Sequence, residues 1–410
     1  FRRKTAPADT KHPAAAFGIK PDTPTMRTLL LAAAMLSCLA VRPASCQNSE
    51  PPASLSGFTL TAGDFDDPRT LPNLETLCRV WGYAKYHHPA FYDTLRRVDI
   101  DSALFSLLPR VVHADREIRN RHLLDWVRSL GDYTPNRVEY EQSLAPLELV
   151  STVDLAWTRD TTLLGRDLSR LLQDLRYAER GENYYLRMGT TGNGPGYHYL
   201  SLRGESFHPT PQMDSGLNLL TLFRLWNIIE YYAPYRAVTL HPWEEVLSTY
   251  IPLMGVETDG RRFARLYMRL IRELNDGHAY APIEMLFGQR MLPVWPLQAD
   301  GRLFVGYSGD SALERGDEVV AIDGEPLSER LELLREYASR SNEASLRRAA
   351  RYYGLCTRRD TAEVVLRRAG ACDTLRVATV PYGNVSPLYD PAQLTQPPFR
   401  LLADSVGYEL

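Results

Sequence analysis

The chain has nine histidines, and the position of one of them suggests chemistry. His278 follows Asn275, Asp276 and Gly277, residue types that end helices and form turns, so we expect its imidazole on a loop at a helix end. Histidine titrates near neutral pH and can act as a general base. The alternative is a structural histidine that caps a helix or is held by hydrogen bonds. A base would also need a nucleophile.

Other catalytic and binding patterns are missing from the sequence. There is no His-Glu-x-x-His or Cys-x-x-Cys pair, so we predict no metal site. His87 and His88 are adjacent and cannot share one helix face, so we expect them to be structural. The run GTTGNGPG at 189–196 lacks the ending of a phosphate-binding loop, which favours a surface loop and no cofactor. Residues 47–410 contain no Gly-x-Ser-x-Gly turn.

Length and charge narrow the class of protein. The 410 residues are enough for two or three domains, and 44% hydrophobic residues can give each domain a core. The 47 basic and 50 acidic side chains are interspersed, with a net charge of −3. No basic stripe is available to neutralise phosphates, so we predict no nucleic-acid partner. Five cysteines are too few for a disulfide-built scaffold.

The start of the chain has the pattern of an export signal. We interpret residues 1–25 as an upstream, non-native segment, 26–46 as a signal peptide with an apolar run too short to span a membrane, and 47–73 as a linker. Cleavage before Gln47 competes with a lipid anchor at Cys46, although Pro43 stands where a lipoprotein signal needs an aliphatic residue. Either route predicts export to the periplasm or cell envelope. There, Cys356 and Cys372 could form a disulfide or remain thiols.

An internal repeat organises the middle of the chain. LETLCRVWGYAKYHHP at 74–89 matches LLTLFRLWNIIEYYAP at 219–234 at a constant spacing of 145 residues. Apolar residues recur every three or four positions, which predicts an amphipathic helix in each copy, followed by two more helices. The matched pairs are Leu74 and Leu219, Thr76 and Thr221, Leu77 and Leu222, Arg79 and Arg224, Trp81 and Trp226, Tyr86 and Tyr231, and Pro89 and Pro234.

The repeat divides the chain into units. Copy one covers 74–140, a connecting segment with a helix and the glycine-rich loop covers 141–216, and copy two covers 217–288. Where copy two has His278, copy one has the segment 131–133, Gly-Asp-Tyr, without a histidine. This asymmetry indicates that copy two has a task that copy one lacks.

A β-rich unit follows the repeat. Short apolar segments separated by turn residues over 291–380 predict strand, turn, strand, helix, strand and strand, an order that fits a PDZ-like domain. Residues 381–403 are rich in proline and predict a linker, and 404–410 predict the first strand of another domain that is cut off.

Four segments resemble the tail-specific, or C-terminal-processing, serine peptidase family, in particular its tricorn-core-like branch from Bacteroidetes-type bacteria. They are LNLLTLFRLWNIIEYYAPYR at 217–236, HPWEEVLSTYIPLM at 241–254, RLIRELNDGHAY at 269–280 and GDEVVAIDG at 316–324. The resemblance implies an α+β multidomain fold with a helical N-terminal part, a PDZ-like domain and the start of a crotonase-like α/β catalytic core. It also implies that His278 is the base and that the Ser nucleophile and the acidic or Lys partner lie beyond Leu410.

The resemblance leads to a functional expectation. We expect the parent protein to be a serine-type endopeptidase that hydrolyses exported or periplasmic polypeptides, which it binds through their C-terminal segments. The mechanism could use Ser, His and Glu, or a Ser/Lys dyad that needs no histidine. The 410 residues lack the nucleophile, so we expect them to be inactive alone. The alternative is a non-catalytic peptide-binding scaffold with a PDZ-like domain.

Overall fold

The computed structural model describes residues 56–92, 98–144, 153–179, 181, 183–191, 197–203, 214–233, 235–384, 399–403 and 406–409. The upstream segment, the signal peptide and Cys46 lie outside these residues. Within the described part, no helix has both the length and the apolar character needed to cross a membrane.

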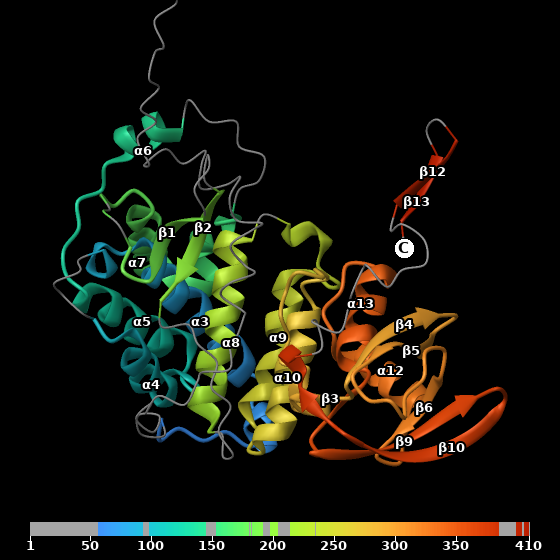
Figure 1. The fold of residues 1–410 in the computed structure, drawn as a ribbon. Coiled ribbons are helices and arrows are strands. Elements are labelled where there is room, and N and C mark those ends of the chain that lie inside the picture. The colour runs from blue at the N-terminus through green and yellow to red at the C-terminus, as the bar shows by residue number, and fades with distance from the viewer. Residues whose placement is uncertain are drawn as a thin grey trace, which may run out of the picture.

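Two sets of three helices form the repeated part of the molecule (Figure 1). Copy one contains α3 (Thr70–His87), α4 (Ile100–Val111) and α5 (Arg116–Ser129), and copy two contains α8 (Ser215–Tyr232), α9 (Trp243–Gly255) and α10 (Gly260–Arg272). Between them lie α6 (Arg137–Leu144), α7 (Thr161–Leu175) and the hairpin of β1 (Leu186–Thr191) and β2 (Tyr197–Leu202). Short 3₁₀ turns occur at Ala62–Asp66, Pro89–Phe91, Ala156–Arg159, Arg236–Val238 and Tyr382–Asn384.

Equivalent residues of the two copies make equivalent hydrogen bonds. The indole Nε1 of Trp81 donates to the carbonyl of Ile100, the first residue of α4, at 2.9 Å. The indole Nε1 of Trp226 donates to the carbonyl of Trp243, the first residue of α9, also at 2.9 Å. Because each bond joins the first helix of a copy to the start of its second helix, the matched tryptophans fix the same helix pair twice.

A second matched pair repeats this pattern at the other end of the second helix. The Asn73 amide donates to carbonyls at the end of α4 and after it, those of Val111 and Ala114, each at 2.9 Å. The Asn218 amide, 145 residues later, donates to the carbonyls of Met254 at 2.7 Å and Glu257 at 2.6 Å, at the end of α9. These asparagines are buried, so their bonds also satisfy groups that would otherwise be costly to enclose.

The first helices of the two copies, α3 and α8, meet at equivalent positions. A Cβ atom on Gly82 would lie 1.9 Å from Oδ1 of Asn227, its partner in the repeat. The amide of Asn227 donates to the carbonyl of Cys78 on α3 at 3.1 Å. The absence of a side chain at residue 82 therefore makes room for the asparagine of the other copy.

Ion pairs cross between the copies in a reciprocal way. Arg79 of copy one contacts Glu244 in the first turn of α9, with Nη1 and Oε1 3.7 Å apart. Arg224, its equivalent in copy two, contacts Asp101 in the first turn of α4. The two copies thus associate with approximate two-fold symmetry.

The β-rich unit adjoins copy two (Figure 1). Its main sheet is antiparallel with the strand order β10-β9-β6-β5-β4, and β7 pairs with β6. The elements are β4 (Val294–Ala299), β5 (Arg302–Ser308), β6 (Glu318–Ile322), β7 (Glu325–Pro326), β9 (Thr361–Arg368), β10 (Ala371–Ala378), α11 (Glu284–Phe287), α12 (Leu327–Tyr337) and α13 (Glu343–Tyr353). A smaller sheet joins β3 (Arg290–Met291), β8 (Cys356–Thr357) and β11 (Val380–Pro381).

Period-two burial explains why β9 is a strand. Ala362, Val364 and Leu366 are buried, and the residues between them are more exposed. Burying side chains of this size contributes roughly 1.5–3 kcal/mol for each valine or leucine. The mixed helical and antiparallel architecture confirms the expected α+β class, whereas the PDZ-like and crotonase-like assignments remain predictions.

Several segments differ from the sequence-based expectation. The linker expected at 47–73 is structured in its described part, because Phe58 and Leu60 are buried apolar side chains and residues 70–73 begin α3. Residues 189–191 of the expected glycine-rich loop belong to β1, which pairs with β2. Residues 399–403 of the expected proline-rich linker form β12 (Phe399–Ala403), because they pair with β13 (Val406–Glu409).

The cysteines beyond the signal are unpaired in the described part of the chain. Cys78 and Cys356 are buried, and Cys372 is exposed. Burial raises the pKa of the Cys356 thiol to about 12, which keeps it protonated at neutral pH. Cys356 and Cys372 are therefore free thiols in the structure and do not form a disulfide with each other.

Candidate functional site at the end of α10

Helix α10 presents one apolar face to the core and a row of arginines to the outside. Its buried residues include Phe263, Tyr267 and Ile271, spaced by four. The helix begins at Asp259, whose carboxylate accepts the backbone N–H of Arg262 at 2.8 Å. Buried packing along this face fixes the direction in which α10 ends.

The turn after α10 is held on both sides. Asn275 has a φ of 52°, in the left-handed region that ends helices, and its amide donates to the carbonyl of Val238 at 2.9 Å. A Cβ on Gly277 would lie 3.0 Å from Cβ and Oγ of Ser345, so glycine allows close approach to α13. Ser339 Oγ donates to the carbonyl of Asp276 at 2.6 Å. The β-rich unit therefore supports the turn that carries His278.

His278 has an exposed side chain with one ring nitrogen held. Nδ1 lies 3.0 Å from Oδ1 of Asp276, and the same oxygen accepts the His278 backbone N–H at 2.9 Å. The side chain is 67% exposed, so the imidazole is on the surface and not in the core. A carboxylate only accepts hydrogen bonds, so Nδ1 is the donor and the neutral ring has its lone pair on Nε2. Within the described residues, Nε2 has no hydrogen-bond partner.

Asp276 is a functional candidate that the sequence interpretation used only as a turn former. A carboxylate on Nδ1 fixes the tautomer of a histidine base and stabilises its charged form. The sequence contained a signal for this role, namely the order Asp276, Gly277, His278. With a glycine between them, the aspartate can turn its carboxylate back towards the histidine ring. Only the coordinates give the 3.0 Å separation.

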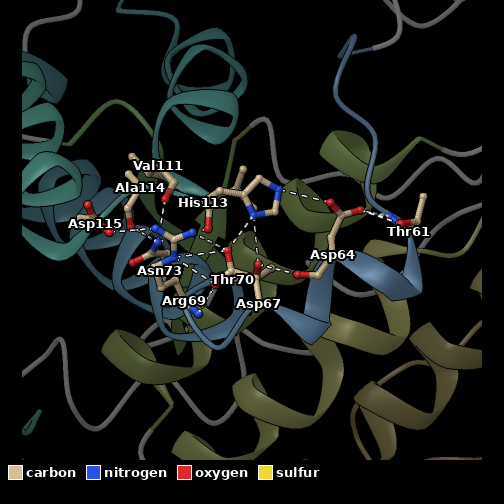
Figure 2. Close-up of polar contacts among 11 residues, drawn as sticks. Thr61, Asp64, Asp67, Arg69, Thr70, Asn73, Val111, His113, Ala114 and Asp115 are labelled. Carbon is tan, nitrogen blue, oxygen red and sulfur yellow. Dashed lines mark hydrogen bonds and ion pairs between the residues drawn. The ribbon is translucent and has the colours of Figure 1, made fainter.

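A second histidine cluster lies in copy one (Figure 2). Its residues Thr70, His113 and Asp64 are of the types that serve as nucleophile, base and acid in catalytic triads. His113 Nε2 lies 3.2 Å from Oδ1 of Asp64, and its Nδ1 lies 3.3 Å from Oγ1 of Thr70 and 3.6 Å from Oδ2 of Asp67. Thr70 is fully buried, however, and its hydroxyl donates to the carbonyl of Asp64 at 2.6 Å. Since this hydroxyl is enclosed and its proton is engaged, the cluster holds the start of α3 and is not a catalytic site.

A third histidine is paired close to α10. His241 Nδ1 lies 2.7 Å from Oε2 of Glu273, and the Tyr250 hydroxyl donates to Oε1 of the same carboxylate at 3.2 Å. The Leu240 backbone N–H donates to the carbonyl of Glu273 at 2.9 Å. Burial, together with the nearby Glu273 charge, raises the pKa of Tyr250. These contacts tie the segment before α9 to the end of α10.

The remaining expectations concern metals and the adjacent histidines. His88 is buried, and His87 stacks on Tyr83 with 4.0 Å between ring centroids, so both occupy packing positions. Among the residues that the structure describes, no group of three or more His, Cys, Asp or Glu side chains could hold a metal ion.

Comparisons with known proteins give weak relatives only. No family model and no curated protein matches the chain. Solved structures of mature CPAF, a chlamydial serine protease, alone and complexed with lactacystin, have 19% sequence identity and TM-scores of 0.32 and 0.31, covering 43% of this chain. A serine-to-alanine mutant of CPAF has 20% identity and a TM-score of 0.30, covering 40%. The matches span 34–38% of the CPAF chains. Matches of this size do not show a family for the chain and do not place it in the tricorn-core-like branch.

Proposed function

We propose that this chain is the histidine-bearing part of a serine-type endopeptidase of the tail-specific family, and that His278 is its general base. The observation that carries the proposal is the geometry of the turn 275–278. An exposed imidazole has Nδ1 fixed by Asp276, and its Nε2 is directed away from that carboxylate. The motif RLIRELNDGHAY, which resembles that family, contains this turn.

The proposed chemistry assigns one step to each group. Nε2 of His278 takes the proton of a serine hydroxyl as the serine attacks a peptide carbonyl, and returns it to the leaving amine. Asp276 stabilises the imidazolium formed between these steps. In this proposal, the serine belongs to the segment that the family resemblance places after Leu410. The 410 residues alone are then inactive.

The same proposal gives the β-rich unit a binding role. Residues 291–380 act as a PDZ-like domain that receives the C-terminal segment of a polypeptide substrate, by addition of a strand to a sheet edge. The substrates are exported or periplasmic polypeptides, in agreement with the export signal that the sequence predicts at 26–46.

The test compares the protein expressed from the complete gene with two variants and with the 410-residue chain. A fluorogenic peptide reports turnover, and a fluorophosphonate probe reports an activated serine. We expect His278→Ala to lower kcat/KM by about 10²–10⁴-fold and to prevent labelling, as expected for loss of a general base. His241→Ala is the matched control, since His241 is also exposed and carboxylate-paired, and should retain both signals.

Each alternative gives a different result in this test. Turnover and labelling that survive His278→Ala would show a Ser/Lys dyad and remove the assigned role of His278. No turnover and no labelling in the protein from the complete gene would favour the peptide-binding scaffold. Turnover by the 410-residue chain that His278→Ala abolishes would contradict its inactivity.

A further inference from the structure

A groove of about 970 Å³ lies between the end of α10 and helix α12, next to the turn that carries His278. Four arginines and four glutamates line it, so its side-chain charges balance. Cavities of this size accommodate ligands as large as a short peptide segment. The distribution of ion pairs within the groove shows which charges are available.

Three of the four glutamates are already engaged. Glu336 accepts hydrogen bonds from Arg269, and Glu332 lies 3.6 Å from Nε of Arg335. Glu273 accepts from Tyr250 and pairs with His241, as described above. The fourth, Glu329, lies in the first turn of α12 and has no ion pair within the described residues.

Two arginines of the groove remain without a carboxylate. Within the described residues, neither Arg272 nor Arg340 has an acidic oxygen within 4 Å. Nε of Arg272 is buried and has no hydrogen-bond partner there, an arrangement that costs free energy. Arg340 makes one hydrogen bond, from Nη1 to the carbonyl of Arg335 at 2.6 Å.

The two guanidiniums are close enough to affect each other. Burial and the charges of Arg272 and Arg335 lower the pKa of Arg340, and the charge of Glu343 opposes them only in part. An anion between them would offset this repulsion. Glu329 cannot do so from its position, because it lies at the start of α12, whereas Arg340 follows the end of that helix.

We propose that Arg272 and Arg340 form a binding site for the carboxylate of a peptide that lies in this groove. A planar guanidinium matches a carboxylate with two parallel hydrogen bonds. The glutamates along the groove disfavour a phosphate dianion more than a singly charged carboxylate, because repulsion grows with ligand charge. The site is independent of the proposed catalysis, since binding needs no nucleophile.

The site is linked through the backbone to the turn with His278. Arg272 is the last residue of α10, and its carbonyl accepts the backbone N–H of Asn275 at 3.0 Å. Arg340 follows Ser339, whose hydroxyl donates to the carbonyl of Asp276. A peptide anchored at the two arginines would therefore lie beside the turn 275–278.

The test is an NMR titration of the 410-residue chain labelled with ¹⁵N-arginine. The Nε–H signals of Arg272 and Arg340 are assigned by their loss in Arg272→Gln and Arg340→Gln. We expect tetra-alanine with a free C-terminus to shift both signals and its C-terminal amide to leave them unchanged. A carboxylate can come from the C-terminus of a peptide or from a glutamate side chain within it. The capped peptide acetyl-Ala-Glu-Ala-amide carries only the glutamate carboxylate, so it shifts the signals only if the site binds side-chain carboxylates.

Variants make the assignment specific. Each glutamine substitution should weaken tetra-alanine binding about tenfold, the effect of losing one charge-assisted pair. Arg261→Gln is the matched control, because Arg261 is exposed at the other end of α10, and it should bind as the unsubstituted chain does. Circular dichroism and thermal unfolding check that each variant folds.

Three results would overturn the proposal. The first is that tetra-alanine and its C-terminal amide shift the arginine signals equally, while acetyl-Ala-Glu-Ala-amide does not shift them. The second is unchanged binding by the double variant Arg272→Gln with Arg340→Gln. The third is a stronger response to inorganic phosphate than to either carboxylate peptide, which would make the site a phosphate site.

Discussion

The ends of α5 and α10 occupy equivalent places in the two copies, but the tyrosine after α5 is bonded within the fold and the histidine after α10 is exposed. After α5, the Tyr133 hydroxyl donates to the carbonyl of Leu171 on α7 at 3.3 Å, and Pro135 forms a bridge with Ala178. After α10, His278 extends into solvent. The connecting segment thus holds Tyr133 after α5, whereas the side chain at the equivalent place after α10, His278, is exposed.

The difference shows that equivalent positions of a duplicated unit can differ in exposure and in hydrogen bonding. In copy one, the Tyr133 hydroxyl is bonded within the fold, so this residue contributes to stability. Copy two keeps the same helix arrangement but leaves His278 and Arg272 with unused hydrogen-bonding capacity. Substitutions in the two copies should therefore differ in whether they change stability or function.

The largest expected effect on stability concerns the contact between the copies. Gly82→Ala places a Cβ 1.9 Å from Oδ1 of Asn227, so the buried Asn227 side chain or the two helices must move, at a cost of about 3 kcal/mol in the free energy of unfolding. Urea denaturation measures this loss. Gly255→Ala is the control, because its Cβ would meet the nearest atom, Leu60 Cδ1, at 3.4 Å. An unfolding midpoint for Gly82→Ala equal to that of the unsubstituted chain would contradict close association of the copies.

The next effect compares the two turns directly. Tyr133→Ala removes a half-buried ring and its bond to α7, and should lower the free energy of unfolding by about 2 kcal/mol. His278→Ala removes an exposed side chain and should change it by less than about 0.5 kcal/mol. Chemical denaturation of both variants gives the comparison. A larger loss for His278→Ala would mean that this histidine is structural.

A smaller effect separates the two reciprocal ion pairs. The Arg224 and Asp101 side chains are 17% and 31% exposed, and the Glu244 side chain that pairs with Arg79 is 66% exposed. Solvent weakens the second pair, so Arg224→Met should destabilise the chain by about 1 kcal/mol more than Arg79→Met. Thermal unfolding of the two variants tests the order. Equal losses would indicate that exposure does not distinguish the pairs.

The smallest effect is a pH dependence in copy one. Hydrogen bonds from Arg69 lower the pKa of Asp67 to about 2. A carboxyl with a depressed folded-state pKa stabilises the fold above its unfolded pKa of about 4, and this contribution disappears as the pH falls towards 2. Between pH 4 and 2, Tm should therefore fall more steeply for the unsubstituted chain than for Asp67→Asn. Parallel curves would show that Asp67 does not contribute.

Much of the fold could be predicted from local patterns. The spacing of 145 residues identified the duplication, and the segment 318–322 is the strand β6 that its apolar residues predicted. Helix α13 was missed, because its many arginines leave only Leu346 and Ala350 buried. The position of His278 on a turn followed from the residues before it.

The rest of the candidate site depends on contacts between distant segments. Ser339 and Arg340 approach the turn 275–278 because α12 packs against α10, a tertiary contact that no local pattern encodes. The unpaired state of Arg272 likewise depends on which carboxylates other segments bring near. Such information is present only when the units are assembled.

The contact between Gly82 and Asn227 also bears on how the repeat arose. If two identical single units had associated as a symmetric dimer, each residue on the axis would face its own copy. Two glycines would leave a gap there, and two asparagines would collide. The observed mixed pair requires two different residues at equivalent positions, so the close approach of α3 and α8 depends on the difference between the two copies.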